Sequence, residues 1–139
     1  MQSGYAFFDH TADVGIRARG ETLHELFIHC AQGLRELIAE HSRVEARHVK
    51  VARLSATSVD SLLLAWLNEL LFWFSADRFL PERYDLDNVS DTSLRGQVYG
   101  EPFDPSRHLS GTEVKGITRH QLAVKQVNGR WEAQVIFDV

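Results

Sequence analysis

The chain has 139 residues, of which 44% are hydrophobic and 24% are charged. This composition is that of a globular protein and excludes a disordered chain. Its formal net charge of -4 disfavours a protein that coats nucleic acid by charge alone. The single cysteine, Cys30, cannot form an internal disulfide and indicates a reducing compartment. We expect no signal peptide, no membrane-spanning segment, and one domain over residues 1–139 in the cytoplasm.

The N-terminal part of the chain predicts two short strands followed by a helix. The strands are expected at residues 5–8 and 14–18, where apolar residues alternate with polar ones in the second strand. Thr22 is a suitable helix cap, and Glu25 lies three residues later to complete a capping box. The apolar residues that follow recur at three- and four-residue spacing and form a single stripe, so this helix should pack on one side and end near Glu40.

A strand is expected at residues 44–55, and a second helix should begin after Ser58 and run to about Phe74. Nearly all of this helix is large and apolar. Its polar residues occupy one narrow stripe: Asp60, Ser61, Asn68 and Glu69. A helix with so little polar surface must be covered on more than one side, so we expect it to lie centrally.

The C-terminal part is rich in strands. One strand is expected within residues 92–101, and two more, at 114–126 and 131–138, flank the tight-turn signal Asn128-Gly129. Two helices with several hairpin-connected strands predict an α+β fold. We expect a layered sandwich of mixed or antiparallel β-sheet with two helices, the second largely buried.

Three oxygen donors stand at the ends of predicted strands. Asp13 begins one strand, Asp138 is the penultimate residue of the chain, and Val139 contributes the terminal carboxylate. Such donors suit a hard cation such as Ca²⁺ or Mg²⁺. The alternative is a turn aspartate at one end and a solvated tail at the other, because the sequence alone does not bring Asp13 near Asp138.

Other polar residues are candidates for a functional role. His10 and Thr11 either orient a carboxylate or ligand, or satisfy backbone groups in a turn. The polar loop after residue 100 holds four ionisable residues within eight positions: Glu101, Asp104, Arg107 and His108. This loop is either a functional site on a rigid scaffold or an ordinary surface loop with weak ion pairs.

Motifs for covalent catalysis are missing from the sequence. It has no GxSxG elbow, no glycine-rich phosphate loop and no paired CxxC, and its seven histidines show no metal-binding spacing. These absences disfavour an enzyme that acts through a nucleophilic side chain.

Taken together, the motifs resemble the archease family. The resemblance covers almost the whole chain in the family's order, with only residues 75–92 contributing little. The matching segments are "DHTADVGI", "GETLHELF", "LLLAWLNELLFWF", "GEPFDPSRH", "VKGITRHQL" and the closing "VIFDV". Each segment is weak alone, but together they are specific.

The resemblance implies a protein cofactor of the RtcB-type RNA ligase, with no catalytic residues of its own. Such a cofactor promotes guanylylation and repeated turnover of the ligase during tRNA splicing and RNA repair, and can widen its nucleotide use. The partner would be the ligase, with RNA reached only through it and no membrane. The resemblance assigns a divalent cation, expected to be Ca²⁺ with Mg²⁺ or Mn²⁺ as alternatives, to Asp13, Asp138 and Val139. The expected supporting or partner-contact residues are His10, Thr11, Glu101, Asp104, Arg107, His108, Lys115, Thr118 and His120.

Two residues depart from the family pattern, and two other functions stay open. Family members commonly carry "KAxTYH" where this chain has "KGITRH", so Gly116 and Arg119 differ. The alternative functions are a metal-dependent phosphoester hydrolase, using Asp13, Asp138 and His10, and a chaperone or RNA-binding module.

Overall fold

The computed structural model of the protein describes residues 4–10 and 13–139. In these residues the chain forms two helices, α1 (Leu23–Ile38) and α2 (Val59–Asp77). The strands, in chain order, are β1 (Gly4–His10), β2 (Asp13–Gly20), β3 (His48–Ser55), β4 (Phe79–Val89), β5 (Ser93–Pro102), β6 (Gly116–Val127) and β7 (Arg130–Asp138).

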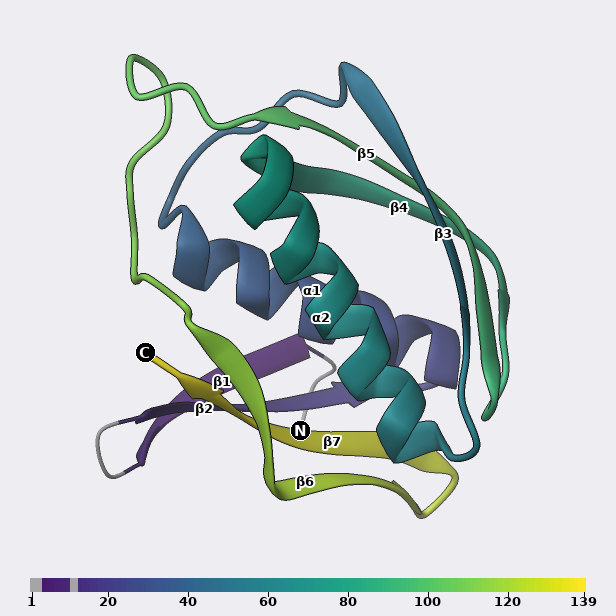
Figure 1. Cartoon of the computed structure of the whole chain (residues 1–139). Coiled ribbons are helices and arrows are strands. Elements are labelled where there is room, and N and C mark those ends of the chain that lie inside the picture. The colour runs from purple at the N-terminus through teal and green to yellow at the C-terminus, as the bar shows by residue number, and fades with distance from the viewer. Residues whose placement is uncertain (1–3, 11–12) are drawn as a thin grey trace.

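The strands form two sheets that enclose the helices (Figure 1). One sheet has the order β1-β2-β7-β6 and the other has the order β3-β5-β4, and every strand pair is antiparallel. Both helices contact both sheets, so they form a middle layer. The layered α+β sandwich predicted from the sequence is confirmed.

Helix α1 begins where its capping residues predict. The Thr22 hydroxyl accepts a hydrogen bond from the Glu25 backbone N–H at 3.0 Å, and the Glu25 carboxylate accepts one from the Glu21 backbone N–H at 3.1 Å. The first bond satisfies a donor that the first helical turn leaves open, and the second holds the chain just before the cap. The apolar stripe of α1 is buried against β1, β2 and α2.

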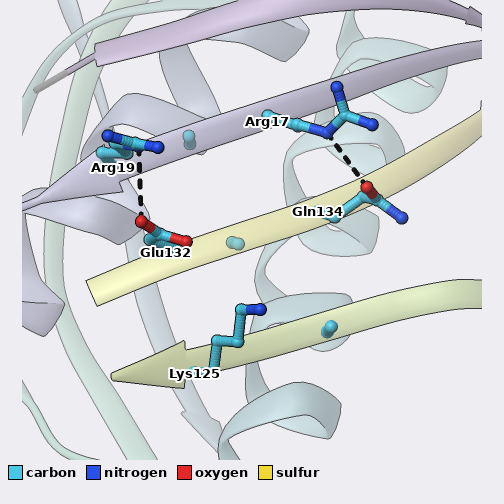
Figure 2. Close-up of a pocket in the computed structure, with 8 residues that line it drawn as sticks. Arg17, Arg19, Lys125, Glu132 and Gln134 are labelled. Atoms are coloured by element: carbon cyan, nitrogen blue, oxygen red, sulfur yellow. Dashed lines mark hydrogen bonds and ion pairs between the residues drawn. The ribbon is translucent and has the colours of Figure 1, made fainter. Parts of the chain in front are cut away.

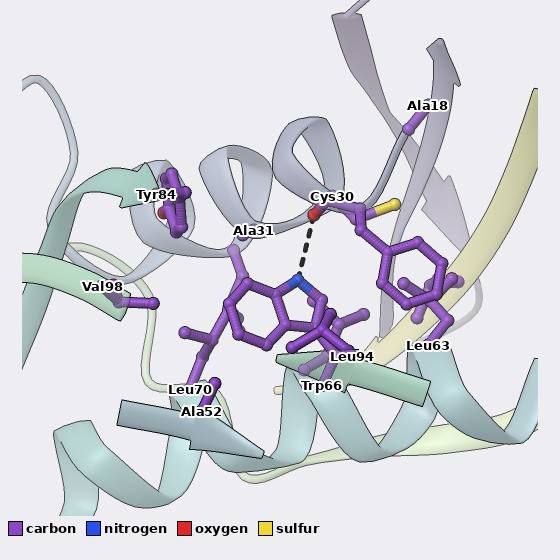
Figure 3. Close-up of a cluster of buried hydrophobic side chains, with 14 of the residues drawn as sticks. Ala18, Cys30, Ala31, Ala52, Leu63, Trp66, Leu70, Tyr84, Leu94 and Val98 are labelled. Carbon is purple, nitrogen blue, oxygen red and sulfur yellow. Dashed lines mark hydrogen bonds between the residues drawn. The ribbon is translucent and has the colours of Figure 1, made fainter. Parts of the chain in front are cut away.

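The two helices meet in the core at Trp66 (Figure 3). The Trp66 indole N–H donates to the Phe27 carbonyl oxygen at 3.0 Å, which satisfies its buried polar atom. The Trp66 ring also meets Tyr84 edge-on, with 6.2 Å between ring centroids. Cys30 is fully buried nearby, and burial raises the pKa of its thiol to about 12, so it is a small core residue rather than a nucleophile.

The exposed strip of α2 is wider than the polar stripe in its sequence. Phe72, which the sequence pattern assigns to the buried side, is 62% exposed and continues the strip that begins at Asn68. The described residues contain one helix, α2, that is long and apolar enough to cross a membrane by length and composition. Its position in the layer between the two sheets accounts for that apolar character.

Strand β4 is the element that the sequence did not predict. It lies at a sheet edge and includes Pro81, which only an edge strand tolerates well. Its register against β5 shifts twice, between Pro81 and Arg83 and between Leu86 and Asn88. These shifts disturb the alternation of buried and exposed residues by which a strand is recognised in sequence.

Candidate functional site

The start of β2 and the end of β7 bring two carboxylates together. Asp13 and Asp138 are directly opposite each other in the antiparallel β2–β7 ladder, and Val139 follows immediately. Residues opposite one another point to the same face of the sheet, with Cβ atoms about 4.5–5.5 Å apart. We call Asp13, Asp138 and Val139 the acidic strand end.

The donor set of the acidic strand end fits a hard cation. Like charges placed directly opposite on a sheet are destabilising, and a bound cation would remove that repulsion. Two side-chain carboxylates and the chain-end carboxylate offer only oxygen, which Ca²⁺, Mg²⁺ and Mn²⁺ prefer. Among residues 4–10 and 13–139, as far as their side chains are described, no three His, Cys, Asp or Glu side chains gather into a metal-binding group.

Strand β6 borders the acidic strand end on its other side. Gly116 is opposite Asp138, and the Lys115 backbone N–H donates to the Asp138 carbonyl oxygen at 2.8 Å. This bond fixes the path of the chain beside the terminus. The exposed Lys115 and the half-buried Thr118 therefore flank the carboxylates, as a supporting or contact role would require.

A bulge in β6 displaces the next candidate residues. The β6–β7 register shifts between Thr118 and Ala123, and Gln121 adopts a φ of 57° within this segment. The His120 backbone N–H donates to the Thr118 hydroxyl at 2.9 Å, and both His120 and Arg119 are exposed. The residue type at 119 therefore changes a surface and not the core.

The other departure from the family pattern, Gly116, is structurally neutral. A Cβ atom built on Gly116 meets no heavy atom within 4 Å, so an alanine fits there without displacement.

Of two further candidates, His10 and Thr11, the structure describes only the His10 backbone. The His10 backbone pairs with Asp13, whereas the His10 side chain and Thr11 lie outside the described residues.

The loop residues predicted from the sequence form a second, buried cluster around Glu101. This carboxylate is only 2% exposed and accepts two hydrogen bonds from Arg107, at 3.1 and 2.5 Å. It also accepts bonds from the Glu45 backbone N–H at 2.8 Å and from the His108 ring at 3.1 Å, and Arg47 lies 3.9 Å away. The Arg107 bonds are the main reason that the pKa of Glu101 is lowered to about 2.

The ring of His108 has a defined orientation. The Asp104 backbone N–H donates to His108 Nδ1 at 2.8 Å, which leaves Nε2 to donate to Glu101. Asp104 also accepts bonds from the Ser106 N–H and hydroxyl, and these bonds lower the pKa of Asp104. This loop is therefore built by its own polar contacts.

Residues 109–114 separate the Glu101 cluster in sequence from Lys115, which lies beside the acidic strand end. Figure 1 shows this stretch in the green loop between β5 and β6. Between them the loop is fastened to the end of α1, where Gly111 N–H donates to Ile38 and Thr112 N–H donates to Leu37. Glu101 and His108 are buried, so their contacts stabilise the loop's start, whereas Lys115 lies beside the carboxylates. The structure thus separates residues that the sequence had grouped.

Sequence reasoning missed the partners of Glu101 from elsewhere in the chain. The Glu45 backbone N–H, 56 residues away in sequence, and the nearby Arg47 approach it from the segment before β3, and no local pattern indicates that contact. The alternation of Arg17 and Arg19 with buried Ile16 and Ala18 correctly predicted one solvent-facing side of β2, but it indicated no binding role for these two arginines.

Comparison with known families identifies a match over nearly the whole chain. Residues 5–139 match the model of the "Archease protein family (MTH1598/TM1083)". The chain is 34% identical to the protein archease of Pyrobaculum islandicum, covering 97% of this chain and 95% of that protein. It is 33% identical to the protein archease of Pyrococcus furiosus, covering 95% and 96%. The resemblance inferred from the sequence motifs is confirmed.

Solved structures agree in fold. The solution structure of Methanobacterium thermoautotrophicum protein 1598 superposes with a TM-score of 0.82 at 33% identity, covering 98% of this chain and 99% of that one. The crystal structure of a Thermotoga maritima archease, described as a possible chaperone, gives a TM-score of 0.63 at 18% identity, covering 95% and 94%. The second likeness bears on the fold alone.

Proposed function

Because this chain belongs to the archease family, we propose that it is a non-catalytic activator of an RtcB-type RNA ligase. In this proposal it promotes guanylylation and repeated turnover of the ligase and can broaden its nucleotide use. It reaches tRNA and other RNA only through that partner. The family membership supports this role.

The observation that carries the proposal is the opposition of Asp13 and Asp138 across the β2–β7 ladder. Two paired strands hold these carboxylates in a fixed relation, and Val139 adds a third carboxylate beside them. Together they would hold a divalent cation, Ca²⁺ first and Mg²⁺ or Mn²⁺ as alternatives. The cation would supply positive charge at an otherwise acidic edge of the molecule.

Guanylylation of the ligase would depend on positive charge placed close to the nucleotide phosphates. It brings nucleotide phosphates, metal ions and a histidine nucleophile together, so positioning and charge neutralisation set its rate. Asp13 and Asp138 would present the cation from a rigid strand end, and the neighbouring Lys115, Thr118 and His120 would contact or orient the partner. The Glu101 cluster would keep the loop that leads to Lys115 in place.

The test is single-turnover guanylylation of an RtcB-type ligase from the same source, with and without this protein. We expect the wild-type protein to accelerate the reaction and Asp13→Ala to abolish that acceleration. Asp91→Ala is the matched control, because Asp91 is an exposed carboxylate in the turn between β4 and β5. Urea unfolding of each variant checks that the fold is retained.

The outcomes separate the proposal from its alternatives. Full activation by Asp13→Ala would overturn the role of the acidic strand end, and no activation by the wild type would overturn the ligase role. Phosphoester hydrolysis by the protein alone would instead support a metal-dependent hydrolase. RNA affinity without the ligase would support an RNA-binding module.

A further inference from the structure

A basic groove runs over the outer face of the four-stranded sheet (Figure 2). Its volume is about 250 Å³. The register pairs Arg17 with Gln134 on β2 and β7, and Ala123 and Lys125 of β6 continue the same face. The residues that line the groove include Arg17, Arg19, Ala123, Lys125, Glu132 and Gln134.

Arg17 is held in place from two directions. Its Nε donates to the Gln134 side-chain oxygen at 3.1 Å, and its guanidinium carbon lies 4.2 Å from the centre of the Phe8 ring. The ring can lie there because Gly15 has no side chain, since a Cβ at Gly15 would come within 2.1 Å of Phe8. Gln134 is itself fixed, because its Nε2 donates to the Gln121 carbonyl at 3.3 Å. The exposed guanidinium is therefore preorganised for an oxyanion.

The groove is positive although the whole chain is negative. Arg17, Arg19 and Lys125 contribute three positive charges, and Glu132, which lies 3.5 Å from Arg19, contributes one negative charge. The balance is +2 in a chain of formal charge -4. Lys125 is exposed, and its strand partner in the β6–β7 ladder is Glu132, the residue that pairs with Arg19.

We propose that this groove binds a phosphate monoester, between the guanidinium groups of Arg17 and Arg19 and the ammonium of Lys125. A phosphate monoester carries about -1.5 to -2 charges at neutral pH and matches the groove's balance. Its oxygens accept bonds from several directions at once, whereas a carboxylate offers one charge and a planar pair of oxygens. The inference stands apart from the proposed function, because it concerns the protein alone.

Inorganic phosphate, although not an ester, shares with a nucleoside monophosphate and the phosphorylated end of an RNA strand a terminal phosphate that can carry two negative charges. NMR titration of ¹⁵N-labelled protein with each of them, at matched ionic strength, distinguishes the sources. An RNA oligonucleotide lacking the end phosphate, acetate and an acidic peptide are the comparison ligands. We expect saturable shifts at the groove residues with the phosphate monoesters, and weaker binding at a pH where the phosphate loses its second charge.

Substitutions locate the site. Arg17→Gln and Lys125→Gln should each weaken binding by about tenfold, the effect of losing one charge-assisted bond. Arg83→Gln should leave binding unchanged. Arg83 stacks on Tyr99 at 4.1 Å, much as Arg17 does on Phe8, but it lies on the other sheet.

The proposal fails if acetate or the acidic peptide binds as well as the phosphate monoesters, if no ligand saturates, or if Arg83→Gln weakens binding as much as Arg17→Gln. If Arg17→Gln disturbs the sheet, Lys125→Gln still tests whether the groove binds the phosphate. Its amide spectrum without ligand shows whether the fold is unchanged.

Discussion

At the scale of single residues, Glu101 is the side chain whose environment departs most from that of an exposed carboxylate. A buried charge is costly unless it is paired and hydrogen-bonded. Arg107, His108 and the Glu45 backbone all donate to Glu101, so its negative charge is fully compensated. These contacts fix the start of the segment 103–115, which leads to the acidic strand end.

Replacing Glu101 with glutamine should lower the free energy of unfolding by about 3 kcal/mol, because it leaves the partners of a buried charge uncompensated. Urea denaturation measures this loss. Asp85→Asn is the control, because Asp85 forms an exposed ion pair with Arg83 at 3.4 Å and should cost less than about 1 kcal/mol. Equal costs for the two substitutions would contradict a stabilising role for the buried cluster.

The same carboxylate predicts a pH dependence. Arg107 and the other donors hold the pKa of Glu101 at about 2, below the usual 4.5. The ionised Glu101 carboxylate therefore contributes its full stabilisation of the fold above the unfolded-state pKa of 4.5. This contribution is lost as the pH falls from 4.5 to the folded-state pKa of about 2. Unfolding free energies measured at about pH 6 and about pH 3 should differ more for the wild type than for Glu101→Gln. Parallel pH profiles would show that Glu101 contributes nothing to acid sensitivity.

At the scale of elements, the pairing of β4 with β5 depends on two glycines of β5. Gly100 is opposite Pro81 and Gly96 is opposite Leu86, the residues at which the β4 register shifts. A Cβ on Gly100 would come within 1.9 Å of the Leu80 carbonyl oxygen, and one on Gly96 within 2.5 Å of the Asp85 carbonyl oxygen. The irregular strand can approach β5 because these positions carry no side chain.

Gly100→Ala should therefore destabilise the protein by about 1–3 kcal/mol, since backbone must move to admit the methyl group. Thermal unfolding measures the effect. Gly116→Ala is the matched control, because its added Cβ meets nothing within 4 Å. A Gly100→Ala variant as stable as Gly116→Ala would mean that β4 can shift without cost.

At the scale of the whole molecule, the fold brings distant segments to one edge. Asp13 near the start of the chain and Asp138 near its end become neighbours because β2 and β7 pair inside the four-stranded sheet. If the acidic strand end holds a cation, binding must stabilise the folded chain, because the unfolded chain does not keep these donors together.

Added Ca²⁺ should then raise the Tm of the wild-type protein, by an amount that grows with the Ca²⁺ concentration, and a chelator should reverse the rise. Asp13→Asn should abolish the Ca²⁺ effect. We expect the Tm of Asp13→Asn to be the same with and without Ca²⁺. Differential scanning calorimetry measures both quantities, and a Ca²⁺ response retained by Asp13→Asn would place the cation elsewhere.

Elements with local sequence signals could be predicted before the fold was known. The Thr22–Glu25 capping box fixed the start of α1, the apolar character of residues 58–74 predicted the central position of α2, and Asn128-Gly129 predicted the β6–β7 hairpin. The donors Asp13, Asp138 and Val139 could also be named, because chain ends and strand-end carboxylates are visible in sequence. The resemblance that assigns a cation to these donors rests on motifs spread over almost the whole chain.

Which of these residues meet depends on contacts between segments that are distant in the sequence. The opposition of Asp13 and Asp138 depends on the register of β2 against β7, two strands from opposite ends of the chain whose pairing no local sequence signal indicates. Contacts between distant segments also bury Glu101 beside the Glu45 segment and form the groove beside Arg17. Strand β4 remained hidden because its proline and register shifts are tolerated at a sheet edge, which is a property of the sheet and not of the strand.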